Sequence, residues 1–118
     1  MTLNFKFEEL RVYQEGLVFV DKVYDLTGHW PKTEMFGLSD QLKRAAGSIV
    51  LNIAEGSSRT VKEFRHFLGM SRGSCYECVA ILTIAKGRGY LSESEFGDLY
   101  EICNKLSRSI SALKVSLR

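Results

Sequence analysis

The sequence has little proline, histidine or cysteine and no long apolar run. Its 118 residues include one proline, two histidines and three cysteines. Because proline breaks helix interiors, its scarcity favours long helices. No stretch approaches the roughly 18 to 20 apolar residues that a membrane-spanning helix needs. The start, MTLNFKFEEL, also lacks the basic region and apolar core of a signal peptide. We therefore expect a soluble, cytosolic protein.

The small number of cysteines argues against a disulfide framework or a zinc site. Cys75 and Cys78 form a C-x-x-C motif, but no second such motif and no pair of histidines completes a set of four ligands. Both residues fall on the apolar stripe of a predicted helix. We interpret them as reduced thiols that fill the core, with Cys103 on another helix as the third.

Glu63 and His66 match the Glu-x-x-His unit from which di-iron helical bundles are built. Such a site needs a second unit, and the other histidine, His29, lies in a predicted loop. Nucleotide-binding glycine motifs are absent. We therefore expect a non-enzymatic protein without a metal or cofactor. A metal-dependent enzyme is the less favoured alternative, and it would use Glu55, Glu63, His66, Glu77 or the cysteines.

The length and the apolar spacing predict one domain of four helices. A chain of 118 residues fits a single domain. Apolar residues recur at steps of three and four with no sustained alternation of period two, which indicates helices and no sheet. Because the links between the helices are short, we expect an antiparallel up-down-up-down four-helix bundle. The predicted domain is 1–118, with helices at roughly 7–27, 34–56, 60–87 and 92–117.

Capping signals and apolar stripes place the helices in more detail. Thr60 with Glu63, and Ser92 with Glu95, match the capping-box pattern, and Thr33 is the expected N-cap of the second helix. The stripe expected to face the core from the first helix is Leu10, Tyr13, Leu17, Val20 and Tyr24. The third helix carries a second apolar edge of Phe67, Met70, Ile81 and Ile84, together with Gly69 and Gly73. We expect this helix to have two packing partners, with another helix close to its glycines.

The net charge of +2 is small but unevenly distributed along the chain. The first predicted helix is acidic, whereas the region from Gln41 to Arg72 is basic. Cations that neutralise phosphates would bind RNA or DNA in a salt-dependent way. A solvated face with internal ion pairs, or complementary faces of an oligomer, would explain the same pattern. No aromatic residues are interleaved to suggest base stacking. The candidate basic band is Lys43, Arg44, Arg59, Lys62, Arg65 and Arg72.

A polar stripe runs beside the apolar line Leu42, Ala45, Ile49 and Ile53 of the second helix. Polar groups in an apolar seam can fix register and oligomeric state. A covered carboxylate such as Glu55 needs a partner, and we expect Arg44 or an arginine of a neighbouring helix or subunit. The stripe consists of Gln41, Arg44, Ser48, Asn52 and Glu55, and Ser74 with Glu77 offers a matching polar pair on the third helix.

The run GLSDQLKRAAGSIVLNIAEGSSR, preceded by WPKTE and followed by EFRHFLGMSRGSCYE and GYL, resembles the family of 23S ribosomal RNA intervening-sequence proteins. The likeness covers essentially the whole chain. It implies a four-helix bundle that assembles as a ring-shaped homopentamer. The accessory proteins of diversity-generating retroelements look like a distant branch that binds nucleic acid and a reverse transcriptase. By position, the resemblance places Gln41, Arg44, Ser48, Asn52, Glu55, Gly56, Ser74 and Glu77 on the family's polar motif.

These observations predict an oligomeric helical bundle of unsettled biochemical role that serves as a scaffold or binding module. In the leading hypothesis, it contacts RNA or DNA through the basic band. The alternative is a subunit that binds only a protein partner, with the basic band against an acidic protein surface.

Overall fold

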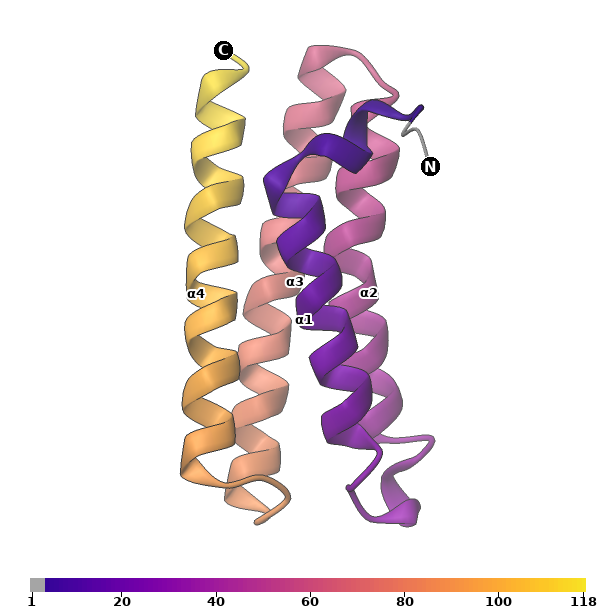
Figure 1. Ribbon diagram of the computed structural model, residues 1–118, viewed down its shortest axis with the longest axis vertical. Helices are drawn as coiled ribbons and strands as arrows, with labels where there is room; N and C mark the ends of the chain where they lie inside the picture. Colours follow the sequence, from indigo (N-terminus) through magenta and orange to yellow (C-terminus); the bar gives the residue numbers. More distant parts are fainter. Residues whose placement is uncertain (1–3) are drawn as a thin grey trace.

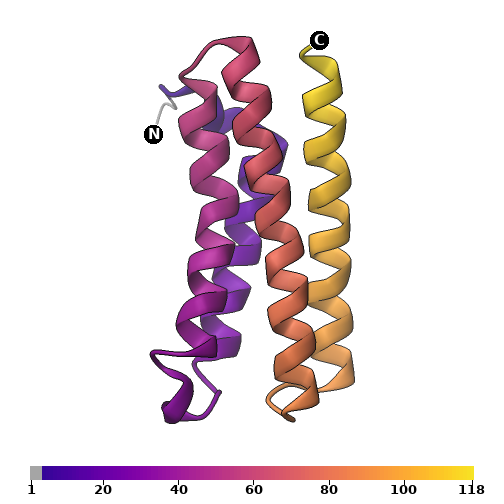
Figure 2. The same ribbon diagram turned by 180° about the vertical axis from the view of Figure 1, so that it is seen from behind.

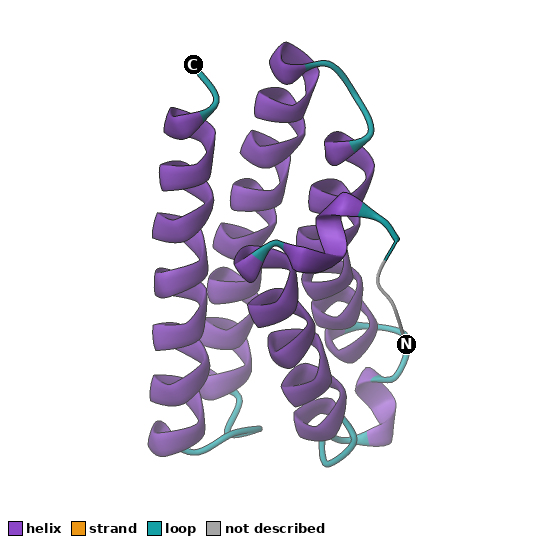
Figure 3. Cartoon of the chain, turned by 45° about the horizontal axis from the view of Figure 1, so that its top comes forward, coloured by secondary structure: helices purple, strands orange, loops and turns teal. Residues whose placement is uncertain are grey.

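Helices account for most of residues 4–118, the part of the chain that the computed structural model describes. The first three residues of the predicted domain lie outside this range. Within residues 4–118 there are four α-helices, two short 3-10 helices and no strand (Figure 3). In chain order the elements are η1 (Lys6–Glu9), α1 (Arg11–Thr27), η2 (Lys32–Glu34), α2 (Leu38–Ser57), α3 (Val61–Gly87) and α4 (Glu93–Ser116).

The long helices lie side by side in a molecule of 42 × 30 × 22 Å. The links from α1 to α2 and from α3 to α4 are at one end, and the link from α2 to α3 is at the other end with the C-terminus (Figure 1). We call the second of these the α2–α3 end. Turned by 180°, the molecule shows α2 and α3 in front of α1, with α4 beside α3 (Figure 2). The most extensive contact joins α2 to α3, and the least extensive contact between long helices joins α1 to α4.

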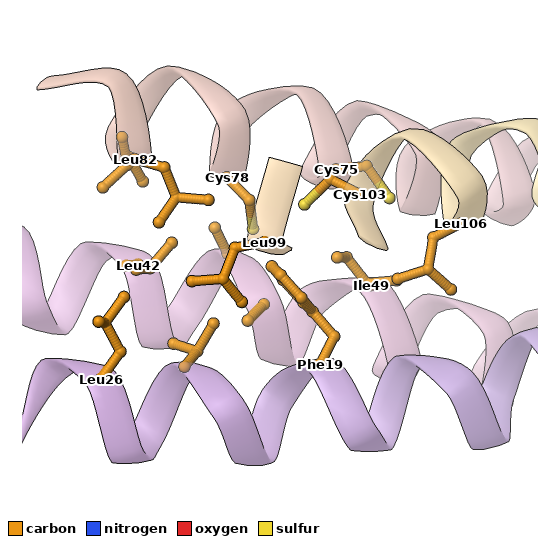
Figure 4. Close-up of a cluster of buried hydrophobic side chains, with 14 of the residues drawn as sticks. Phe19, Leu26, Leu42, Ile49, Cys75, Cys78, Leu82, Leu99, Cys103 and Leu106 are labelled. Atoms are coloured by element: carbon orange, nitrogen blue, oxygen red, sulfur yellow. The ribbon is translucent and has the colours of Figure 1, made fainter. Parts of the chain in front are cut away.

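All four helices contribute to one buried apolar core. Phe19 of α1, Ile49 of α2, Leu82 of α3 and Leu106 of α4 are almost fully buried and belong to the same cluster (Figure 4). The apolar line predicted for the second helix is buried from Leu42 to Ile53, and its first member, Leu38, is half-buried against the core. Burial of a large aliphatic or aromatic side chain contributes about 1.5–3 kcal/mol, so this core is the main stabilising element.

The buried face of α1 differs from the predicted stripe. Leu17 and Tyr24 are 44% and 56% exposed, whereas Phe19 and Val23 are fully buried. Both faces have the spacing of an amphipathic helix, but the buried one contains Gly16. A Cβ atom on Gly16 would lie 2.6 Å from Val50 Cγ1. Only the glycine face therefore allows α1 to approach α2 this closely.

Two predicted helix starts are wrong, because a short 3-10 helix precedes each of these two α-helices. The first α-helix begins at Arg11 and not at residue 7, since Leu10 has an extended conformation with ψ of 129°. The second begins at Leu38 and not at residue 34, and Thr33 lies inside η2. The carboxylate of Glu34 caps this helix instead, because its Oε1 accepts a hydrogen bond from Leu38 N at 3.2 Å.

Both predicted capping boxes are confirmed. Thr60 and Ser92 accept hydrogen bonds from the backbone N–H groups of Glu63 and Glu95, and the two glutamates bond back to the capping residues. The starts of α3 and α4 accordingly fall one residue after the capping residues, where the sequence pattern places them.

None of the helices within residues 4–118 combines the length and the apolar character that crossing a bilayer requires.

Candidate functional site

The polar residues at the contact of α2 with α3 form a small hydrogen-bond network. Ser74 Oγ donates to Ser48 Oγ at 2.9 Å, and Asn52 Nδ2 donates to Ser48 Oγ at 2.9 Å and to the Ser48 carbonyl at 2.8 Å. One turn away, the buried Ser71 hydroxyl donates to the Ile49 carbonyl at 2.7 Å. The bonds from Ser74 to Ser48 and from Ser71 to Ile49 join the two helices, so they require one alignment of α2 with α3 and help to select its register.

Gly56 lies where α2 packs tightly against α3. A Cβ atom there would lie 2.5 Å from Phe67 Cβ and 3.0 Å from Phe64 Cδ1. Carbon atoms in favourable contact are about 3.5–4.0 Å apart, so a larger residue would force the helices to separate. The glycine of the predicted polar motif is thus a packing requirement.

The expectation that another helix approaches Gly69 and Gly73 is not met within residues 4–118. The nearest neighbour of a Cβ atom on Gly69 would be Lys114 Nζ at 3.4 Å, and a Cβ atom on Gly73 would meet nothing within 4 Å. Whether a second subunit approaches Gly73 stays a prediction.

Glu55 has a partner other than the one expected first. Its Oε2 lies 2.8 Å from Arg59 Nη2, whereas Arg44 is 4.0 Å from Asp40. Arg59 is four residues after Glu55, just beyond the end of α2, where its side chain reaches back along the helix. Both members of the pair are about half exposed. Exposed pairs typically contribute about 0–1 kcal/mol, so this one adds little stability.

The predicted polar stripe therefore divides into two groups. Ser48, Asn52, Ser74 and Gly56 lie at the contact between α2 and α3, where they are half-buried or buried. The other members of the stripe, Gln41, Arg44, Glu55 and Glu77, are exposed in the single chain. Periodicity identified the stripe, but the covered part of it is narrower than expected.

The structure does not bring the six predicted basic residues into one band. Lys43 packs over the Tyr24 ring at 5.4 Å and lies with Arg44 in the first half of α2. Arg59, Lys62 and Arg65 lie at the α2–α3 end, about 20 Å farther along the helix axis at 1.5 Å per residue. Arg59 is also committed to two carboxylates, at 2.8 Å from Glu55 and 3.9 Å from Glu63.

A basic residue that the sequence analysis missed joins the α2–α3 end. Lys114 of α4 lies beside α3, because Arg65 Nε donates to the Lys114 carbonyl at 3.3 Å and the Lys114 side chain passes Gly69. A signal for this was present in the sequence. From Asn104 to Arg118 the chain has four bases and no acidic side chain. Pairing of α4 with α3 places part of that charge next to Arg65.

The three cysteines are buried in the core and form no disulfide. Their sulfurs lie among apolar side chains of the cluster (Figure 4). Burial raises the pKa of the Cys75 thiol to about 12, and a hydrogen bond with Cys103, together with burial, raises the pKa of Cys78. Such thiols are neutral at physiological pH and are neither good nucleophiles nor ready metal ligands.

Glu63, the first residue of the Glu-x-x-His unit, has a structural role in the capping box of α3. The Thr60 hydroxyl donates to Glu63 Oε1 at 2.8 Å, and the Thr60 N–H lies 3.3 Å from the same oxygen. These bonds lower the pKa of the Glu63 carboxyl. The ring of His66 packs edge-on against Phe67, with centroids 6.2 Å apart. Within residues 4–118, no cluster of three or more His, Cys, Asp or Glu side chains could hold a metal ion.

Comparisons with known proteins identify the family and a structure of the same fold. The family model described as 23S rRNA-intervening sequence protein matches residues 8–112. The chain belongs to this family. A solved structure from Bacteroides thetaiotaomicron, described as a protein of unknown function from the S23 ribosomal protein family, has the same fold. Its TM-score is 0.81 at 17% identity, over 87% of this chain and 94% of that one. No curated protein matches.

In this member of the 23S rRNA-intervening sequence protein family, the WPKTE and GYL motifs meet at the end opposite the α2–α3 end. The Tyr90 hydroxyl donates to Glu34 Oε2 at 2.8 Å, and the rings of Tyr90 and Trp30 are 5.8 Å apart. The bond from Tyr90 and the one from Leu38 N–H lower the pKa of the Glu34 carboxyl. Two motifs that are distant in the sequence therefore hold the two loops of this end together.

Proposed function

We propose that this chain is the subunit of a cytosolic, non-enzymatic scaffold that binds RNA or DNA. In this proposal the antiparallel up-down-up-down bundle assembles into a ring-like homo-oligomer. The nucleic-acid contact is made by the cations of the α2–α3 end, chiefly Lys62, Arg65 and Lys114.

The gathering of these three cations from α3 and α4 is the observation that carries the proposal. Within residues 4–118, Lys62, Arg65 and Lys114 take part in no ion pair, unlike Arg44 and Arg59. Arg65 donates to a neutral carbonyl, which leaves its charge uncompensated. Unpaired cations at one end of a molecule attract phosphates and release their counterions.

The surface beside the Ser48–Asn52–Ser74 network supports the oligomeric part of the proposal. Leu51 adjoins Asn52 on α2 and is 68% exposed, and Met70 lies one turn before Ser74 on α3 and is 42% exposed. Gly73 adds open space on the same helix. Apolar side chains that stay exposed beside a polar network are typical of an interface between subunits.

Light scattering tests the assembly. We expect a mass several times the 13.4 kDa of one chain at micromolar concentration. A clean monomer under these conditions would refute the oligomeric scaffold.

Salt-dependent titration of labelled RNA and DNA tests the nucleic-acid contact. In the double variant Lys62→Ala with Arg65→Ala, we expect weaker binding and a slope of log K against log salt that is smaller by about 1.5. Each phosphate contact contributes about 0.7 to 0.9 to that slope. The matched control, Lys22→Ala with Lys32→Ala, removes the same charge from exposed positions away from the α2–α3 end. Equal effects of the two double variants, or no binding by the unaltered protein at about 50 mM salt, would contradict the proposal.

A further inference from the structure

Helices α3 and α4 run side by side (Figure 2), and side chains of both line a shallow groove. Two tyrosines from different helices flank it, Tyr76 at 58% exposure and Tyr100 at 43%. Its floor includes the buried thiols of Cys75 and Cys103. The remaining lining residues are Val79, Asn104 and Ser107. The sequence places Tyr76 and Tyr100 far apart, so only the packing of α4 on α3 brings them to one groove.

The size and lining of the groove limit what it can hold. Its volume is about 230 Å³, below the roughly 300 Å³ at which pockets for small molecules begin. It therefore has room for one ring-sized group and not for a whole cofactor. The tyrosines offer flat aromatic faces, and the exposed amide of Asn104 supplies both a donor and an acceptor. A planar group with polar edges fits these surfaces, and a nucleobase is such a group.

Arg72 adds a cation beside the groove. Its guanidinium packs over the Tyr76 ring at 4.9 Å, and Nη2 donates to the Tyr76 hydroxyl at 2.8 Å. These two contacts favour one orientation of the exposed ring, so less side-chain entropy is lost when a ligand stacks on it. They also place a positive charge beside the position of a stacked base, where a phosphate of the same strand would lie.

The charged residues along α4 differ between the two ends of the groove. Before Asn104 this helix carries the acids Glu93, Glu95, Asp98 and Glu101, and after it the chain carries the bases Lys105, Arg108, Lys114 and Arg118. On α3, Arg65 lies three turns from Tyr76, about 16 Å at 1.5 Å per residue. Toward the α2–α3 end, a polyanion leaving the groove therefore meets Arg65 and Lys114. In the other direction Glu93 is paired with Lys86, and Glu95 and Asp98 lie on the α1 side of α4.

We propose that this groove holds an unpaired base of single-stranded RNA or DNA, stacked on Tyr76 and Tyr100. From the groove, the backbone runs past Arg72 to Arg65 and Lys114. A duplex cannot use the site, because its bases are already stacked inside the helix. This inference rests on the proposed function, since it adds preference for single strands to the binding at the α2–α3 end.

The experiment compares three labelled probes at about 50 mM salt: a short single-stranded RNA, the single-stranded DNA of the same sequence, and its duplex. The test variant is Tyr76→Leu with Tyr100→Leu, which keeps the thiols covered but removes the aromatic rings. Stacking of one base contributes about 1–3 kcal/mol, so we expect about 5- to 140-fold weaker binding of the single strands. We expect duplex binding to stay within about twofold. The control Tyr24→Leu removes an exposed tyrosine of α1, and we expect wild-type affinity.

A second measurement does not depend on how well the variant folds. Ultraviolet crosslinking of the unaltered protein to a single strand that contains a photoreactive pyrimidine is expected to label the peptides of Tyr76 and Tyr100. If the unaltered protein binds none of the three probes, both this inference and the proposed function are overturned. If Lys62→Ala with Arg65→Ala weakens binding but the tyrosine variant does not, the groove alone is refuted. Crosslinks at other peptides would also refute the groove as the binding site. A tyrosine variant that changes only the mass of the assembly would refute it too, and would show that the groove is a contact between subunits.

Discussion

Replacement of Gly56 by alanine tests the close approach of α2 to α3. A single methyl group is added at a position where the structure allows no Cβ atom, since it would lie 2.5 Å from Phe67 Cβ. That atom is next to the backbone of Phe67, so it cannot move away by a change of rotamer. The helices must separate by about 1 Å to restore an ordinary contact of about 3.5 Å.

The magnitude follows from two opposing effects. Overpacking of this kind costs about 1–3 kcal/mol. Alanine favours a helix interior over glycine by up to about 1 kcal/mol, and the gain is smaller at Gly56 because it is the second-last residue of α2. We therefore expect Gly56→Ala to lower the free energy of unfolding by about 0.5–2 kcal/mol. The matched control is Gly97→Ala in α4, where a Cβ atom would meet nothing within 4 Å, and we expect a small gain in stability.

Urea unfolding followed by circular dichroism at constant protein concentration measures both variants. The midpoint of Gly56→Ala is expected to fall and that of Gly97→Ala to rise or stay constant, with unchanged slopes. If Gly56→Ala is as stable as Gly97→Ala, α2 and α3 do not meet as described. The packing argument for the glycine of the polar motif would then be wrong.

Three further predictions address the network, the thiols and the loop end. Ser74→Ala removes the bond to Ser48, and we expect a loss of about 1 kcal/mol in urea unfolding, whereas the exposed Ser94→Ala should change stability by less than about 0.5 kcal/mol. The three cysteines should resist a thiol reagent in the native protein at about pH 8 and react on unfolding, because all three are buried and burial raises the pKa of Cys75 to about 12. Rapid labelling of the native protein would contradict this. Tyr90→Phe removes a hydrogen bond that lowers the pKa of Glu34, so it should destabilise the protein at pH values above the unfolded pKa of 4.5. The difference in unfolding free energy between the variant and the unaltered protein should shrink as the pH falls below that value. A difference that is independent of pH would show that this bond does not act through the carboxylate.

Helix positions and helix starts could be read from the sequence where the signals are local. The capping boxes at Thr60 and Ser92 act within one turn, so their residue types alone fix the starts of α3 and α4. The buried line from Leu42 to Ile53 was predictable because α2 has only one face with that apolar spacing. The start of α2 was not, since the cap comes from Glu34, four residues upstream and outside the usual pattern.

Where two faces had similar spacing, the sequence could not choose between them. On α1, the faces of Leu17 and Phe19 both read as amphipathic, and the choice depended on Gly16 fitting against Val50. The sequence likewise could not show which charged side chains lie together. The basic residues were visible in the sequence, but Arg59 turned back to Glu55, and Lys114 came to Arg65 from a helix 49 positions away.

The sequence by itself determined four helices, the caps of α3 and α4, the family pattern and the polar stripe around Asn52. These depend on periodicity and on contacts within a turn or two of helix. Only the tertiary structure decided which side of α1 is buried, which cations gather at the α2–α3 end, and that Tyr76 and Tyr100 flank one groove. The reason is that each of these outcomes depends on the distance between atoms of different helices, and a helix encodes its faces but not the neighbour that each face will meet.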